Sequence, residues 1–363
     1  MKVVVRSIAT ANPPVRGSQQ EAAAFMEQIT SLPEPIRKRI PRIYEQTAID
    51  FRYSCIEDYR RPVDEFDFFP RTPSLQPAPS TCERNERYRA AAIPLAEDVA
   101  ADALARADIT PAGVSHVIVV SCTGFFAPGL DIELVKRLGL PPETSRTFIG
   151  FMGCYAAFNG LRAAQSFCLA HPGATVLMVC IELCTLHFQV DGSMESAVIN
   201  ALFSDGAAAA VVQSLEDAES GLEYLGGRAL LQDDSMDAMT WAVGDTGFIM
   251  GLSSRVPDLI ARDLPGYIDQ LLAPHGLSKA DVGFWAIHPG GKAIVQKAQE
   301  VLGLSDGDVY DSLEVLRLHG NMSSPTILFV LERMMNRRAS GDIGVALAFG
   351  PGLTIEGALL RSV

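Results

Sequence analysis

The chain has 363 residues, of which 48% are hydrophobic and 20% charged, and its formal net charge is −13. These values exclude a disordered chain, and the negative charge opposes nonspecific binding to nucleic acid or anionic lipid. No apolar run approaches the ~18 residues that a membrane span needs. The length exceeds what one hydrophobic core usually serves, so we expect a globular protein of two coupled units, with neither nucleic acid nor a membrane as partner.

The N-terminal segment 1–14 and the cysteines both bear on localisation. The segment turns polar at Thr10 and lacks the apolar core and cleavage site of a signal peptide, so it is predicted to be a first strand. The seven cysteines are odd in number, include no CxxC pair and lie mostly in apolar segments. This pattern indicates reduced thiols in a cytoplasmic protein, with neither a disulfide framework nor a metal site.

Two unusual segments, 36–46 and 60–82, precede the regular part of the chain. The first, IRKRIPRIYEQ, carries a cluster of cations: Arg37, Lys38, Arg39 and Arg42. In an acidic protein such a cluster can grip phosphate groups, or it can be the solvated face of a helix. The second segment is rich in proline and has no helical period. It is predicted to be a long irregular segment before a helix at 97–109.

Strands and helices are then predicted to alternate. Strands are expected at 116–123, 147–154, 175–183 and 207–214, with helical segments around 131–140 and directly after Cys154. These strands are continuously apolar, which is typical of strands covered by helices on both faces. The fold class is therefore predicted to be α/β.

A polar, glycine-containing stretch at 215–227 separates this part from a second α/β pattern. We place the boundary near 215–225, which gives halves of 1–220 and 221–363. The second half is predicted to hold helices at 258–277 and 292–304 and strands at 282–288, 343–350 and 355–363. Both halves place a glycine-rich turn after a buried strand, and turns at strand ends are where α/β proteins build their sites.

Cys154 lies in the stretch GFMGCYAAFNGLRAA, between a predicted strand and a predicted helix. A helix N-terminus favours a thiolate, and beside a cationic histidine the thiol pKa would fall below its usual value of about 8.5. The alternative is that Cys154 packs in the core, as free cysteines commonly do and as Cys168 and Cys180 are expected to do.

His288 and Asn321 are the other candidates for chemistry. His288 ends a buried strand beside a glycine turn in AIHPGG, and Asn321 stands between a glycine and a predicted helix start in HGNMSSPT. Taken singly, each has an ordinary explanation as a core, capping or turn residue. Together, Cys154, His288 and Asn321 supply a thiol, a base and a neutral donor, a set that suits acyl transfer with an oxyanion to stabilise.

Five motifs occur in the order FMGCYAAFNGLR (151–162), ALFSDGAAA (201–209), AIHPGG (286–291), HGNMSSP (319–325) and AFGPG (348–352). In this combination the chain resembles the type III polyketide synthases, the chalcone-synthase-like branch of the thiolase superfamily. The resemblance covers nearly the whole chain. It implies a thiolase-like layered αβαβα fold built from two related α/β halves, and a homodimer.

The resemblance also implies roles for the site residues. Cys154 would accept the acyl group, and His288 and Asn321 would form the pocket in which malonyl-CoA loses CO2 and its enolate is held. His288 would pair with the Cys154 thiolate at rest. Malonyl-CoA and an acyl-CoA starter would be the substrates, with no cofactor and no metal. Phe203 matches the phenylalanine that the family places between the coenzyme A tunnel and the acyl cavity; without the resemblance it reads as a core aromatic.

Several positions depart from the plant pattern of this family. Met250 stands for a second gate phenylalanine, and Ala127 for a methionine that reaches into the partner's cavity. Cys122 and Thr123 are expected on the cavity wall, and His187 near a position that usually holds a threonine. These departures leave the starter and the product open, whereas the triad is unaffected.

Coenzyme A phosphates would be bound in the basic segment. Arg39 and Arg42 match family cations and Lys38 lies beside them, while a third family cation falls on Gln46. Two alternatives remain to the iterative synthesis of a pyrone, resorcinol or related aromatic polyketide. One is a single-condensation β-ketoacyl synthase III-like enzyme, and the other is a non-catalytic acyl-CoA-binding relative of thiolase.

Overall fold

The computed structural model describes residues 1–217, 220–335 and 337–363. Within these residues one sheet of nine strands runs through the molecule in the order β11-β12-β13-β8-β1-β7-β6-β4-β5. Its strands are β1 (Lys2–Ala11), β4 (His116–Ser121), β5 (Ser145–Gly150), β6 (Thr175–Leu183), β7 (Asp205–Leu215), β8 (Leu222–Leu231), β11 (Val282–Ile287), β12 (Ile343–Gly350) and β13 (Thr354–Ser362).

Eleven α-helices are described in the same ranges. They are α1 (Gln19–Glu27), α2 (Glu34–Arg37), α3 (Ile40–Gln46), α4 (Thr81–Arg106), α5 (Leu130–Arg137), α6 (Ala156–Ala170), α7 (Met194–Leu202), α8 (Val256–Leu272), α9 (Lys292–Leu302), α10 (Asp306–His319) and α11 (Thr326–Met335). Two antiparallel strand pairs stand apart from the main sheet. They are β2 (Val15–Ser18) with β3 (Phe51–Ser54), and the hairpin of β9 (Met239–Gly244) with β10 (Gly247–Leu252).

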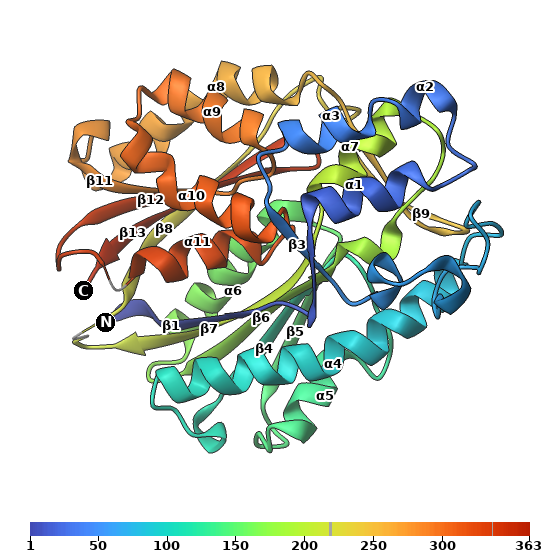
Figure 1. Cartoon of the computed structure of the whole chain (residues 1–363). Coiled ribbons are helices and arrows are strands. Elements are labelled where there is room, and N and C mark those ends of the chain that lie inside the picture. The colour runs from blue at the N-terminus through green and yellow to red at the C-terminus, as the bar shows by residue number, and fades with distance from the viewer. Residues whose placement is uncertain (218–219, 336) are drawn as a thin grey trace.

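The helices and the sheet form alternating layers (Figure 1). Helices α4 and α5 lie under the strands β1, β7, β6, β4 and β5, and α8 and α9 lie above β11, β12, β13 and β8. Helices α6, α10 and α11 occupy the middle, between the two parts of the sheet. This is the layered αβαβα arrangement that the resemblance implied.

Three hydrophobic cores fill the spaces between these layers. The side chains of strand β4 alternate between two of these cores. Val117 and Val119 belong to the core between α4 and the sheet, and Ile118 and Val120 belong to the central core. The third core joins α8 and α9 to β12 and β13. The expectation that these strands are covered on both faces is confirmed for β4 and β6.

Strand β5 corrects that expectation. It ends at Gly150, directly before the turn that leads to Cys154, and it lies at the end of the sheet order with β4 as its one partner among the described strands. Phe148 on this strand is 44% exposed. The apolar letters of 147–150 therefore mark an uncovered edge strand and not a buried one.

Other boundaries also differ from the sequence-based expectations. Helix α4 begins at Thr81, well before residue 97, because Ser80 and Glu83 form a capping box, and the helix continues through Pro94. Strand β8 lies in the stretch 215–227 that was expected to separate the halves, and the pair β9–β10 was not expected at all. Residues 218–219 of the predicted boundary region lie outside the described residues.

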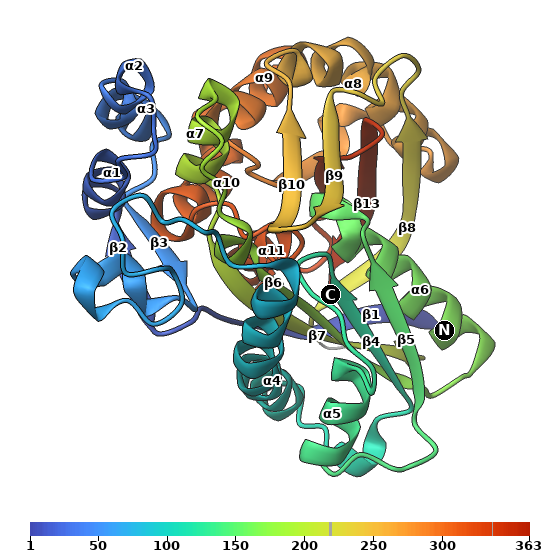
Figure 2. The same cartoon turned by 90° about the vertical axis from the view of Figure 1, so that its right-hand side faces the viewer.

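The hairpin β9–β10 stands beside α7 (Figure 2), on the side of the molecule opposite the two termini (Figure 1). Its strands pair antiparallel, with Met250 opposite Trp241. Within the described part of the chain, no helix combines the length and the hydropathy that a bilayer crossing requires.

Candidate active site

Cys154 is placed by a tight turn between β5 and α6. Phe151 and Gly153 have φ angles of 57° and 79°, in the left-handed region, and Gly153–Tyr155 forms a single 3₁₀ turn before the helix begins at Ala156. A Cβ on Gly153 would meet Pro351 Cδ at 2.5 Å, so glycine is required both for the turn and for the close approach of the loop 349–352. The motifs around Cys154 and at 348–352 thus depend on each other.

His288 follows the last residue of β11 and is 1% exposed. Its backbone N–H donates to the Leu347 carbonyl at 2.8 Å. Neither ring nitrogen has a hydrogen-bond partner within the described residues. A buried imidazole without partners is costly, so its two nitrogens are the clearest sign of a ligand site in the molecule.

Asn321 is held on three sides. Its backbone N–H donates to Leu202 O at 2.9 Å, its side-chain Oδ1 accepts from Ser323 N–H at 2.8 Å, and its Nδ2 donates to Gly290 O at 3.1 Å. These bonds fix which end of the amide is the donor. One N–H of Nδ2 donates to Gly290 O, and Asn321 is also a hydrogen-bond donor that favours the thiolate form of Cys154.

Two cavities meet at Cys154. The inner cavity is lined by residues that include Cys122, Thr123, His187 and Trp241, and the outer cavity by residues that include His288, Asn321, Gln46 and Lys292. Open solvent included, they contain about 900 Å³ and about 1940 Å³ of space free of protein atoms. Four side chains line both cavities: Cys154, Phe203, Met239 and Met250. Phe203 and Met250 therefore stand where one cavity opens into the other.

Burial shifts the pKa values of Cys154 and His288. It raises the pKa of the Cys154 thiol to about 11 and lowers the pKa of His288 to about 3. Each shift disfavours the charged form of its group. The loss of hydration thus opposes the expected lowering of the thiol pKa and is a larger effect than the hydrogen bonds from Ser323 and Asn321, whereas the ion pair at rest stays a prediction.

His187 forms part of the inner cavity wall and is 6% exposed. Its Nε2 lies 2.7 Å from Thr123 O and its Nδ1 accepts from Phe248 N–H at 3.0 Å, so the ring is neutral with its proton on Nε2. The ring stacks on Phe248 at 4.2 Å between centroids. Burial lowers its pKa to about 4.

Sequence reasoning missed Trp241 and Glu182. Trp241 lines the inner cavity and its Nε1 donates to Cys122 O at 2.9 Å, but the hairpin that carries it was not foreseen. Glu182 is fully buried, and its carboxylate accepts from Cys122 N–H, Thr123 Oγ1 and Ser324 Oγ. Burial raises its pKa. The signal for Glu182 was present, since it is a single acid in the apolar stretch TVLMVCIEL.

Four predicted residues lie outside both cavities. Ala127 is exposed on the loop beside Phe125 and Phe148, and lines neither cavity of its own chain. Lys38 and Arg39 are exposed between α2 and α3, Arg42 is exposed on α3, and Lys38 pairs with Glu34 at 2.5 Å. Helix α3 instead presents Ile43 and Gln46 to the outer cavity, one turn beyond the arginines.

Comparison with known proteins identifies the family of this chain. Models of the chalcone and stilbene synthases match residues 2–215 (N-terminal domain) and 229–363 (C-terminal domain). The α-pyrone synthesis polyketide synthase-like protein Pks18 of Mycobacterium tuberculosis is 36% identical over 98% of this chain and 90% of its own. The 3,5-dihydroxyphenylacetyl-CoA synthase of Amycolatopsis orientalis is 36% identical over 71% of each chain. The crystal structure of PKS-I from the brown alga Ectocarpus siliculosus superposes with a TM-score of 0.94 and 37% identity, over 100% of this chain and 98% of its own.

The chain therefore belongs to the chalcone and stilbene synthase family. It is a type III polyketide synthase, an acyltransferase with a thiolase-like mixed α/β fold. The resemblance drawn from the five motifs is confirmed at the level of the family, the fold class and the activity.

Proposed function

We propose that Cys154 carries the growing acyl chain and that His288 and Asn321 bind the reacting carbonyl groups. The observation that carries this proposal is the pair of unpartnered ring nitrogens on His288, buried in the outer cavity that Cys154 and Asn321 also line. The site presents a thiol, a neutral imidazole and an oriented amide N–H. The Glu182 carboxylate acts on Cys154 electrostatically, and its oxygens accept hydrogen bonds from Cys122 N–H, Thr123 Oγ1 and Ser324 Oγ.

Loading requires that the Cys154 thiol lose its proton, for which His288 is the base. As Cys154 Sγ attacks the carbonyl of an acyl-CoA starter, its proton passes to His288, and the imidazolium returns that proton to the departing coenzyme A sulfur. The new thioester on Cys154 and the free thiol of coenzyme A balance the step. A buried thiol with a raised pKa thus depends on His288 for its activation.

During extension, Asn321 and His288 would stabilise the negative charge of an enolate oxygen. When malonyl-CoA loses CO2, the negative charge moves onto the thioester oxygen, where Asn321 Nδ2 and His288 can donate to it. The enolate carbon then attacks the Cys154 thioester, and the sulfur leaves. Each round lengthens the chain by two carbons, and the chain finally cyclises to a pyrone, resorcinol or related aromatic product.

The two cavities divide the substrates. The outer cavity suits the coenzyme A arm, with Arg39, Arg42 and Lys38 near its α3 side and Lys292 on its wall. The inner cavity, with its aromatic and thiol lining, suits the acyl chain. Phe203 and Met250, which line both, act as the gate between them, and the flexible thioether of Met250 makes that gate compliant.

A second copy of this chain is the proposed partner. Strand β5 is an uncovered sheet edge, and Phe125, Phe148 and Phe151 beside it are 50%, 44% and 38% exposed. An edge strand with exposed aromatics favours pairing with another chain. Sedimentation should give a dimer, and Phe148→Glu should shift it toward the monomer; an unchanged mass would contradict the interface at β5. The cytoplasm is the proposed location, since all seven cysteines are free.

The test is an incubation of the purified protein with malonyl-CoA and a panel of acyl-CoA starters, read by mass spectrometry. We expect products that contain several malonyl-derived units and an acyl adduct on Cys154. Products with one added unit would instead indicate a single-condensation enzyme. An adduct on another cysteine, with Cys154→Ala still active, would overturn the assignment of the nucleophile.

A further inference from the structure

Strand β11 ends at Ile287, directly before His288, and it lies at the end of the sheet order with β12 as its neighbour. The His288 N–H points to β12, where it donates to Leu347 O. In a strand, successive N–H groups point to opposite sides, so the Ile287 N–H faces away from the sheet. Without another partner, this buried donor would be unsatisfied.

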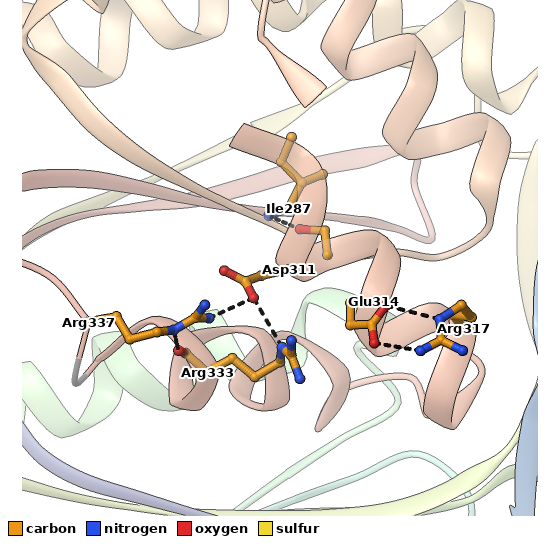
Figure 3. A network of polar contacts seen from close by, with 7 residues as sticks. Ile287, Asp311, Glu314, Arg317, Arg333 and Arg337 are labelled. Carbon is orange, nitrogen blue, oxygen red and sulfur yellow. Dashed lines mark hydrogen bonds and ion pairs between the residues drawn. The ribbon is translucent and has the colours of Figure 1, made fainter. Parts of the chain in front are cut away.

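Ser312 on helix α10 supplies that partner. Its Oγ accepts from the Ile287 N–H at 3.0 Å, and its side chain is fully buried. Figure 3 shows this contact between the end of the strand and α10. The Ser312 hydroxyl therefore accepts the hydrogen bond that the carbonyl of a further strand would otherwise accept on the outer side of β11.

The contact between Ser312 and Ile287 affects the position of the His288 ring, because no hydrogen bond from a ring nitrogen fixes that position. Both lack partners among the described residues, so the position of the ring depends on the backbone that carries it and on packing. The backbone on either side of the 287–288 peptide is held by two bonds, one to Leu347 O and one to Ser312 Oγ. Removing the second bond frees one side of the strand end.

The same helix sets the position of Asn321. Helix α10 ends at His319, and a single glycine with φ 69° separates it from Asn321. Helix α11 begins at Thr326, so the loop 320–325 spans two helices. Asp311 joins them, since its Oδ1 accepts from Arg333 at 3.1 Å and from Arg337 at 2.6 Å (Figure 3).

We infer that Ser312 is a positioning residue for the decarboxylation step, through which helix α10 sets His288 and Asn321 at a fixed separation. This inference rests on the proposed function of those two residues. Displacements well below 1 Å matter for catalytic groups, so the loss of this contact should lower the rate of the chemical step more than the affinity for the substrate.

The experiment compares the whole protein with Ser312→Ala in malonyl-CoA decarboxylation, followed as acetyl-CoA formation. We expect kcat to fall about tenfold, the effect of one hydrogen bond, while KM changes less than about twofold. Ser312→Thr keeps the hydroxyl and should restore kcat to within about threefold of the wild type. Ser312→Cys keeps the shape but is a weak acceptor, so it should behave like Ser312→Ala and serves if that variant does not fold.

Ser7→Ala is the matched control. Ser7 is a buried serine on β1, remote from the site, whose Oγ donates to Ala103 O at 2.7 Å. It should lower the melting temperature as Ser312→Ala does, but leave kcat unchanged. A Ser312→Ala variant with wild-type kcat, or an equal loss of kcat in Ser7→Ala, would overturn the inference alone. A wild-type protein unable to decarboxylate malonyl-CoA would overturn the proposed function as well.

Discussion

Two buried histidines, one on the inner cavity wall and one in the outer cavity, share an environment but not a role. His187 has both ring nitrogens bonded and stacks on Phe248, whereas His288 has both nitrogens without a partner. Burial lowers the pKa of each ring, to about 4 and about 3. The difference shows that burial and a shifted pKa do not distinguish a structural histidine from a catalytic one. The two histidines are distinguished by whether their ring nitrogens have hydrogen-bond partners within the protein or remain available to a ligand.

The largest effect on activity should come from replacing Cys154, which lines both cavities. Cys154→Ala should lower product formation by more than about 10³-fold, because the covalent anchor of the chain is lost. Cys154→Gln should also lose synthesis but keep malonyl-CoA decarboxylation, since His288 and Asn321 remain in place. Cys168→Ala, a buried cysteine of α6 outside both cavities, is the control and should remain active. Decarboxylation that survives in His288→Ala but not in Cys154→Gln would reverse these roles.

Replacing each histidine by alanine tests the comparison directly. His288→Ala should lower the rate of decarboxylation about 10²- to 10³-fold and change the free energy of unfolding little, because no protein partner is lost. His187→Ala should retain decarboxylation but lower the free energy of unfolding by about 2 to 4 kcal/mol, since it leaves a cavity and an unpaired Phe248 N–H. Urea unfolding and acetyl-CoA formation measure the two effects. A similar profile for both variants would refute the distinction.

The pH dependence of stability sharpens the same comparison. Both histidines have folded pKa values below 6.5, so the unfolded chain binds more protons than the folded chain between pH 6.5 and 4. The contribution of these two histidines to the free energy of unfolding should therefore fall as the pH falls through this range, by up to about 1.4 kcal/mol per pH unit for each, while Asp205, whose pKa burial raises to about 6, contributes in the opposite direction. His187→Gln removes one titrating group, so its stability should fall less steeply. Parallel curves for the wild type and the variant would contradict the assignment of a neutral, buried His187.

A smaller effect is expected at the proposed dimer interface. Ala127→Met should fill space at the partner's cavity, at a cost of about 1 to 3 kcal/mol where the site is tight, so longer acyl starters should suffer first. The measurement is the product yield across acyl-CoA starters of increasing length. With alanine in place, aliphatic starters should compete well against aromatic ones. An unchanged starter profile in the variant, with no advantage of medium-chain over aromatic starters in the wild type, would contradict the cavity argument.

The smallest effect concerns the wall of the outer cavity. Gln46→Lys restores a cation where the family usually has one, and should lower KM for malonyl-CoA about two- to fivefold, with a benefit that shrinks at high salt. Gln28→Lys, exposed on the surface outside both central cavities, adds the same charge and should leave KM unchanged. Equal effects of the two substitutions would indicate a general charge effect and not a phosphate contact.

The motifs around Cys154, His288 and Asn321 could be predicted from the sequence because each residue follows a buried strand or precedes a helix, and such local signals are written in consecutive residues. The same holds for β4 and β6, whose apolar letters match burial on both faces. The hairpin of Trp241 was missed because its alternation is weak, with Met239 the one buried residue of β9. Strand β5 was misjudged because apolar letters do not distinguish a covered strand from an edge strand.

What the sequence alone determined is thus the family, the α/β class and the identity of the reactive groups, since these depend on residue type and local order. The pKa shifts of Cys154 and His288 were decided by tertiary structure, because they follow from burial that neighbouring residues in the chain do not reveal. The meeting of two cavities at Phe203 and Met250 was also decided there. The contact of Ser312 with Ile287 was likewise decided by tertiary structure. These residues are 25 positions apart along the chain and come together only through the packing of α10 on β11.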